Sequence, residues 1–193
     1  MSILPSERQC FEILKEEGCS PKVIRHVCTV NIVAMIIASR VKADRDLVNA
    51  GSLLHDVGRS RTHGVRHVSE GVAIARARNF PEPLIRVISR HIAAGLTKDE
   101  AKALGLPDGE YMPETVEEKI VCHADNLVSD DKVTTLQEAL DDLYSKGYTN
   151  TAERMKAMHH ELSALCGEDI NIMLADAMIT DKVTKKCAAY SVL

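Results

Sequence analysis

The sequence predicts an all-α protein, and three observations support this. Apolar residues recur at helical spacing along most of the chain, as in the stripe formed by Val23, Val30, Val33 and Ile37. Several segments begin with residues typical of helix N-caps and end with glycine. Alternation of apolar and polar residues, which indicates half-buried strands, is scarce. A length of 193 residues suits one domain with a helical extension.

Start and stop signals divide the first half of the chain into five helices. Ser6 with Gln9 forms a capping box, Ser20 precedes Pro21 at a first helical position, and Gly95 closes the last helix. The stretch 59–64 is polar and basic, which indicates a loop. The helices are expected at residues 6–18, 20–40, 44–58, 67–78 and 83–94.

The second half contains further helices of the same kind. Thr97 with Glu100 and Asn150 with Glu153 are interpreted as capping boxes. The tail from Asp181 is expected to be loose. Residues 1–130 are expected to form the core domain and residues 131–193 a helical extension packed on it. The helices are expected at residues 97–105, 113–128, 133–146, 151–165 and 170–178.

Composition excludes several classes of protein. A formal net charge of −4 and an aromatic content of 3% argue against stable nucleic-acid binding. The six cysteines form no CxxC pair, so we expect reduced thiols and no zinc ribbon. The N-terminal residues lack a signal peptide, and the apolar stretch 27–39 is too short for a membrane span and contains Asn31. We therefore expect a cytoplasmic protein without a membrane partner.

His55 and Asp56 are the residues that most strongly suggest chemistry. They follow an apolar helix, where unpaired polar groups are costly. His26 lies 29 positions earlier and Asp125 lies 69 positions later, each on an apolar helix. Taken singly, His26 could be a core histidine bonded to a carbonyl, and Asp125 could be an exposed acid beside Asn126. Together, two imidazoles and two carboxylates on three helices are better explained as ligands of a divalent metal.

The order His26, His55-Asp56 and Asp125 resembles the defining pattern of the HD-domain metal-dependent phosphohydrolases. The string LVNAGSLLHDVGR is similar to that family's apolar helix running into HDIGK, and EEKIVCHADNL is similar to its late helix with the final aspartate. The resemblance covers about residues 20–129 and implies an HD-type helical bundle with additional C-terminal helices. The departures are Arg59 where lysine is common and Val57 for isoleucine.

Two further histidines extend the resemblance to a binuclear site. His67 begins one expected helix and His91 lies near the end of the next, as do the second-ion ligands of binuclear HD proteins. The resemblance implies that Asp56 bridges two ions, of which one also binds His26, His55 and Asp125. Without it, His67 would be a surface residue and His91 a partner of a helix dipole. The expected cofactors are one or two divalent ions of Mn, Fe, Co, Ni, Zn or Mg.

The activity implied is hydrolysis of a phosphomonoester or phosphodiester, expected in a nucleotide, by metal-activated hydroxide. Asp56, Asp125 and Arg59 are the expected catalytic residues, with Arg59 stabilising the phosphoryl oxygens. The expected partner is therefore a small phosphorylated substrate, and a homodimer is also possible. Four more cations are candidates for a basic rim around the site: Arg61, Arg66, Arg90 and Lys98.

Two other functions are compatible with this sequence. Some binuclear HD-fold proteins are di-iron oxygenases, and a domain of this fold could also be an inactive ligand-binding unit. The remaining histidines are not expected to be metal ligands: His63 lies in a loop facing substrate or solvent, His123 lies on the far side of its helix from Asp125, and His159-His160 lies in a surface-like helix. Tyr144 and Tyr148 are expected to serve packing rather than a pocket.

Overall fold

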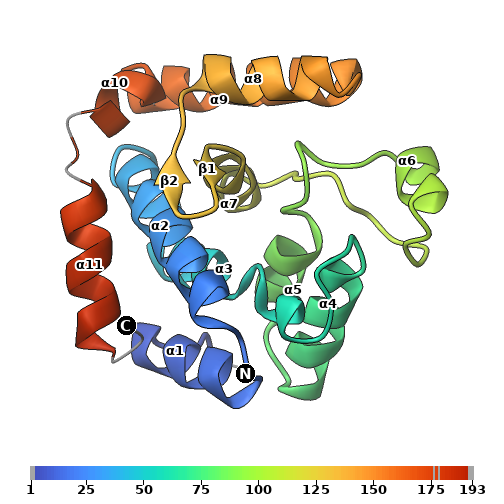
Figure 1. Ribbon diagram of the computed structural model, residues 1–193, viewed down its shortest axis with the longest axis vertical. Helices are drawn as coiled ribbons and strands as arrows, with labels where there is room; N and C mark the ends of the chain where they lie inside the picture. Colours follow the sequence, from blue (N-terminus) through green and yellow to red (C-terminus); the bar gives the residue numbers. More distant parts are fainter. Residues whose placement is uncertain (1–2, 176, 178, 191–193) are drawn as a thin grey trace.

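The computed structural model describes residues 3–175, 177 and 179–190, and these residues are mostly helical, which confirms the all-α prediction (Figure 1). A 3-10 helix, η1 (Val57–Ser60), follows α3, and two short strands, β1 (Val128–Ser129) and β2 (Lys132–Val133), follow α7. The α-helices are α1 (Glu7–Glu16), α2 (Pro21–Ala38), α3 (Arg45–Leu54), α4 (His67–Ala77), α5 (Glu82–Ser89), α6 (Lys98–Ala103), α7 (Val116–Asn126), α8 (Leu136–Ser145), α9 (Thr149–Cys166), α10 (Ile170–Ala175) and α11 (Ile179–Ala189).

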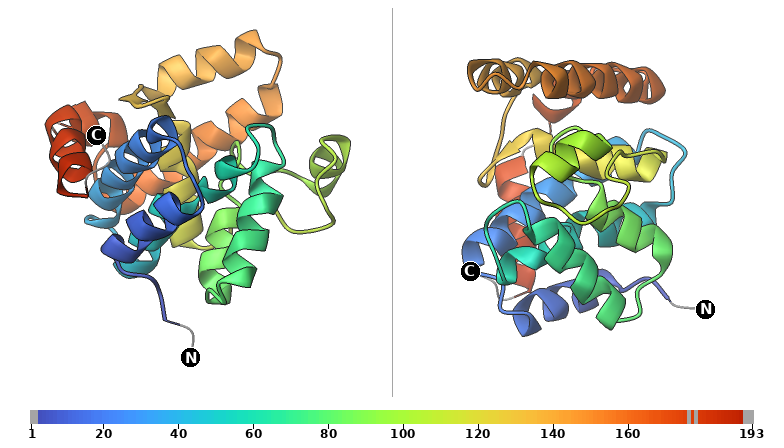
Figure 2. Two further views of the ribbon diagram at one scale, coloured as in Figure 1. Left: turned by 60° about the horizontal axis from the view of Figure 1, so that its bottom comes forward. Right: turned by 90° about the vertical axis from the view of Figure 1, so that its right-hand side faces the viewer.

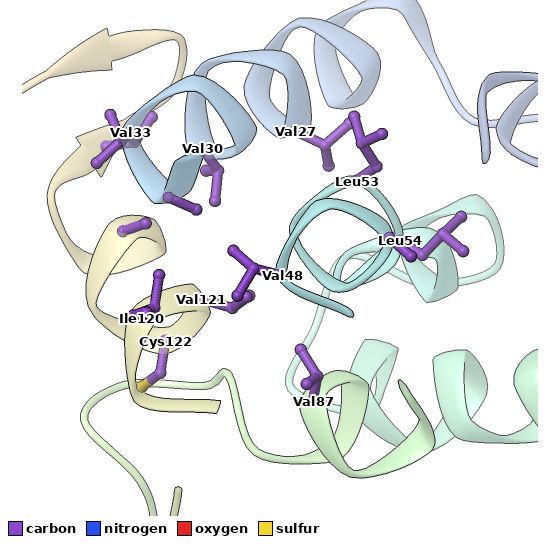
Figure 3. Packing of buried hydrophobic residues seen from close by; sticks show 14 of the residues in the cluster. Val27, Val30, Val33, Val48, Leu53, Leu54, Val87, Ile120, Val121 and Cys122 are labelled. Atoms are coloured by element: carbon purple, nitrogen blue, oxygen red, sulfur yellow. The ribbon is translucent and has the colours of Figure 1, made fainter. Parts of the chain in front are cut away.

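Helix α2 lies at the centre of the core. Its apolar residues pack against α3, α7 and α11, and Figure 3 shows Val30 of α2 near Val48 of α3 and Val121 of α7. By length and composition α2 could cross a membrane, but 67% of it is buried inside the structure. Its hydrophobicity is therefore explained by the core that it forms with its neighbours.

The remaining helices surround this core in two groups. Helices α4 and α5 pack against each other beside η1 and α3, and the segment carrying α6 extends outward from them (Figure 1). Helices α8 and α9 form a hairpin that lies across one end of the core, as both views in Figure 2 show. Helix α9 contacts α7, while α10 and α11 contact α2. The proposed domain boundary at residue 130 stays a prediction.

Several predicted boundaries are wrong. The helix expected to continue to residue 94 ends at Ser89, and the short β1–β2 hairpin was not expected. Helix α7 begins after Thr115, which forms a capping box with Glu118, rather than at Pro113. A further capping box, Thr135 with Glu138, begins α8. Asn150 is not a cap, because α9 already begins at Thr149.

The end of the chain is the largest correction. Helix α11 spans residues 179–189 and so includes most of the tail that was expected to be loose from Asp181. Helix α10 ends at Ala175, and residues 176 and 178, at the expected end of that helix, lie outside the described residues. Cys187 of α11 is fully buried, with its sulfur 3.3 Å from that of Cys28 on α2. Lys186 donates hydrogen bonds to Glu7 and Asn31. Apolar burial and these bonds hold α11 on the core.

Candidate metal centre

The six predicted ligands come from five segments and meet at one place in the fold. His26 projects from α2, and His55 and Asp56 follow the last turn of α3. Packing of α2 on α3, and of α7 on both, brings Asp125 toward these residues. His67 begins α4 and His91 follows α5. The structure therefore brings together all six side chains that the sequence singles out.

Asp56 lies between two pairs of imidazoles. Its Oδ1 is 3.2 Å from Nε2 of His67 and 3.6 Å from Nε2 of His91. Its Oδ2 is 3.6 Å from Nε2 of His26 and 3.8 Å from Nε2 of His55. Two ligand groups that could each hold an ion thus share Asp56. Ligands bonded at about 2.1 Å around a tetrahedral ion lie about 3.4 Å apart, so these spacings fit a metal site.

Asp125 adds a second carboxylate on one side of Asp56. Its Oδ1 is 2.9 Å from Nε2 of His26 and 3.4 Å from Nε2 of His55. It is partly exposed, whereas Asp56 and His55 are buried. The group with His26 and His55 therefore opens toward solvent, while the group with His67 and His91 lies deeper.

Backbone carbonyls orient the four imidazoles. The Nδ1–H groups of His55, His67 and His91 donate to the carbonyl oxygens three residues earlier, at 2.7, 2.8 and 2.8 Å. His26 instead donates from Nδ1 to the carbonyl of Asp130, at 2.6 Å, in the turn between β1 and β2. With Nδ1 used in this way, each Nε2 is left to face Asp56, as metal-binding histidines require.

Unpaired polar atoms support the metal interpretation. Nε2 of His55 and Oδ1 of Asp56 are buried and make no hydrogen bond among the described residues. Such atoms are costly in a protein interior unless a cation or a donor satisfies them. One divalent ion held by the group with His26 and His55 would satisfy Nε2 of His55, and another held by the group with His67 and His91 would satisfy Oδ1 of Asp56. Nitrogen with carboxylate oxygen is a common donor set for transition metals. The residues of this cluster therefore fit the divalent metal ions that the sequence implies.

The electrostatics of the cluster favour ionised carboxylates, but they do not favour neutral imidazole at every position. Burial opposes a charged His26, yet Asp125 and Asp56 outweigh it and raise the pKa of His26 to about 9, and Asp56 likewise raises the pKa of the buried His91. Burial opposes ionisation of Asp56, but the neighbouring imidazoles of His55 and His91 outweigh it and hold the pKa of Asp56 well below its usual range. The pKa of Asp125 is lowered similarly by His55 and His26. Burial and the charge of His91 lower the pKa of His67 to about 4, so His67 is a neutral imidazole at pH 7. Metals bind ionised carboxylates and neutral imidazole, so an ion entering the cluster would displace protons from His26 and His91.

The cations are arranged differently from the prediction. Arg59 donates from Nε to Oδ2 of Asp56 and lines the cleft beside it. The expected basic rim is wrong, because Arg61 binds Glu70, Arg90 is buried between Glu114 and Glu118, and Lys98 binds Glu110. Arg66 is exposed and does not line the cleft.

The four histidines outside the cluster have different surroundings. His123 is not among the candidate ligands, as predicted. Its Nε2 forms a hydrogen bond of 3.0 Å with Nδ1 of His159. His159 was expected on the surface, yet it is buried between α9 and α7, while His160 is exposed. His63 is exposed and lines the cleft. Tyr144 and Tyr148 do not line it.

A cleft of about 810 Å³ opens above the cluster. One wall carries His26, Asp56 and Asp125, together with Arg59 and residues of the β1–β2 turn. The other wall is the α8–α9 hairpin, which contributes Glu138, Ala139, Asp142, Leu143 and Met155. This volume suits a small organic ligand. The sequence does not predict the second wall, because the position of α8 depends on its packing against α9 and on that of α9 against α7.

Comparison with known proteins finds a family model and related sequences. The sequence model of the HD domain matches residues 23–130. An uncharacterized protein of Methanocaldococcus jannaschii is 45% identical over 127 residues, which cover 63% of this chain and 75% of that protein. A tRNA (cytidine(56)-2'-O)-methyltransferase of Picrophilus torridus is 45% identical over 173 residues, which cover 90% of this chain. This chain spans about half the length of that methyltransferase, since the match covers 51% of it.

Solved structures share the fold at low sequence identity. The HD domain of the phosphodiesterase PgpH of L. monocytogenes has a TM-score of 0.51 and 18% identity, covering 80% of this chain and 95% of that domain. A second structure of that domain is a complex with cyclic-di-AMP, with a TM-score of 0.51 and 17% identity, covering 80% of this chain and 93% of that one. At this level of identity the likeness concerns the fold alone.

Proposed function

This chain belongs to the HD domain family, and on that premise we propose that it is a metal-dependent phosphohydrolase acting on a phosphomonoester or phosphodiester bond of a nucleotide. The observation that carries the proposal is the Asp56 carboxylate, whose two oxygens face two separate imidazole pairs. A carboxylate shared in this way suits two ions held side by side. Such pairs of ions are typical of sites that hydrolyse phosphate esters.

The residues divide into those that hold ions and those that act on substrate. His26, His55, Asp56 and Asp125 would hold one ion, and Asp56, His67 and His91 the other. When bound, a divalent ion lowers the pKa of water toward neutrality and withdraws charge from a phosphoryl oxygen. Asp125 is partly exposed in the cleft, where it can accept a proton from the attacking water. Arg59 can turn its guanidinium from Asp56 toward the phosphoryl oxygens.

We favour hydrolysis of a nucleotide over methyl transfer as the reaction of this chain. A structural neighbour is described as a phosphodiesterase in complex with a cyclic dinucleotide. The methyltransferase names belong to relatives about twice as long as this chain. The cleft of this chain offers imidazoles and carboxylates suited to ions, so we favour hydrolysis for it.

The test combines metal analysis with an activity screen. Purified protein should contain a divalent metal by elemental analysis, and it should release phosphate or nucleotide from phosphorylated substrates under Mn, Fe, Co, Ni, Zn or Mg. The Asp56→Asn variant should lose both metal and turnover while circular dichroism stays unchanged. The matched control is Asp141→Asn, an exposed carboxylate on α8 that does not line the cleft.

Three outcomes separate the alternatives. A protein that binds no divalent metal contradicts the proposal. Metal binding without hydrolysis of any substrate favours the inactive ligand-binding domain. Iron with the visible absorption of a di-iron centre under air, without phosphatase activity, favours the oxygenase.

A further inference from the structure

The sign of the charge around the cleft limits what its substrate can be. Among the residues that the structure describes, two lysine or arginine residues line it, Lys22 and Arg59, and both already contact carboxylates. Five carboxylates line it: Asp56, Asp125, Asp130, Glu138 and Asp142. With neutral histidines this lining carries a net charge of about −3, so two divalent ions would bring it only to about +1.

That charge can neutralise one phosphoryl group and little more. A phosphomonoester carries about two negative charges at pH 7, and each further phosphate would lie in a cleft with no free cation among its lining residues. Sites that bind polynucleotides instead neutralise many phosphates with lysine and arginine. The cleft therefore opposes polyphosphates and nucleic acids.

The far wall has a different chemistry from the metal side. Ala139, Leu143 and Met155 form an apolar surface on the α8–α9 hairpin. Glu138 and Asp142 lie one helical turn apart and both line the cleft beside this surface. Glu138 accepts two hydrogen bonds from Thr135 through Oε2, but its Oε1 has no partner among the described residues. A carboxylate beside an apolar surface suits a ligand that offers hydroxyl donors and a flat organic body.

The metal side indicates where a phosphoryl group would lie. Asp56 is 99% buried, lines the same cavity, and has an oxygen without a hydrogen bond. We propose that the substrate carries a single phosphoryl group at the metal side, and that its organic part lies on α8 with hydroxyl groups donating to Glu138 and Asp142. A ribonucleoside monophosphate is the class that matches. This inference rests on the proposed function and narrows its substrate.

The test is a binding measurement on the metal-loaded protein, with four proteins and three probes. Calorimetry compares phosphonate analogues, whose C–P bond is not hydrolysed, of adenosine 5'-monophosphate, adenosine 3',5'-bisphosphate and 2'-deoxyadenosine 5'-monophosphate. The proteins are the wild type, Glu138→Gln, the double variant Glu138→Gln with Asp142→Asn, and the control Asp141→Asn. Glutamine also serves in a capping box, so α8 should keep its start. Asp141 bears the same charge on the same helix but does not line the cleft.

We expect the wild type to bind the monophosphate about threefold to tenfold more tightly than the bisphosphate, the range for screened charges across a cleft. The double variant should lose most of that preference, and Asp141→Asn should keep it. Glu138→Gln should reduce the preference for the ribose form over the deoxyribose form.

Two results would overturn the inference. One is a wild type that binds the bisphosphate as tightly as the monophosphate. The other is a double variant that keeps both preferences of the wild type. Because binding is measured apart from turnover, either result leaves the proposed hydrolase intact if phosphate release is observed. Absence of all metal-dependent hydrolysis instead defeats the proposed function.

Discussion

Gly58 lies where η1 touches the first turn of α4, and a side chain there should disrupt both the fold and the candidate metal centre. A Cβ at Gly58 would lie 2.0 Å from the carbonyl oxygen of His67 and 2.5 Å from the backbone nitrogen of Gly71. Carbon–oxygen contacts are normally about 3.3 Å or longer, so the two segments would have to separate by about 1.3 Å. No rotamer change relieves this contact, because both neighbours are backbone atoms.

We therefore expect Gly58→Ala to lower the free energy of unfolding by about 3 kcal/mol, the upper end for overpacking. The same movement displaces His67, so the bound metal per chain should also fall. Urea unfolding and elemental analysis measure the two effects. Gly64→Ala is the matched control, because its nearest neighbouring atom is 4.0 Å away and its change should stay within about 0.5 kcal/mol. A Gly58→Ala protein as stable as this control would refute the close packing of η1 on α4.

Three other predictions concern the metal, pH and the C-terminal helix. After a chelator has removed bound metal, adding a divalent ion at 100 times its dissociation constant should raise the free energy of unfolding by about 2.7 kcal/mol in calorimetry. If none of the ions stabilises the protein, the metal centre is contradicted. Burial lowers the pKa of His159 below 6.5, so the unfolded chain binds a proton that the folded chain resists. The free energy of unfolding, measured with urea, should therefore fall as the pH drops through 6.5. It should fall less in His159→Gln, and an equal dependence on pH in both proteins would contradict this role of His159. Deleting residues 179–193 should make Cys28 reactive to a thiol reagent under native conditions, whereas unchanged labelling would show that α11 does not cover it.

The helices were predictable where local chemistry decides their ends. The capping boxes at Ser6 and Thr97 and the Pro21 start are all present in the structure. The Asn150 box failed because Thr149 already lies in the helix, and side chains that could cap compete with their neighbours. Helix α11 is held in place by residues of α2 that lie far away in the chain, and a sequence read segment by segment does not show such partners.

The buried histidine pair shows a similar limit. His159 lies in a helix whose sequence is largely polar, and only packing of α9 on α7 places it against His123. The same packing brings the carboxylates of α8 over the cleft. The cations near the ligands in the sequence predicted a basic rim. The charge around the cleft instead depends on the carboxylates of α8, whose position is set by helix packing.

The orientation of the ligands separates what is local from what is not. His55, His67 and His91 each donate to a carbonyl three residues earlier, so the turn that carries the histidine also aims it. Such an arrangement can be anticipated from the sequence, because it needs only a helical turn next to the histidine. His26 depends on the carbonyl of Asp130, 104 positions away. Asp130 adopts a left-handed φ of 55° in the β1–β2 turn, so this small hairpin, absent from the predicted helices, has a function: it aims the imidazole of α2 at Asp56.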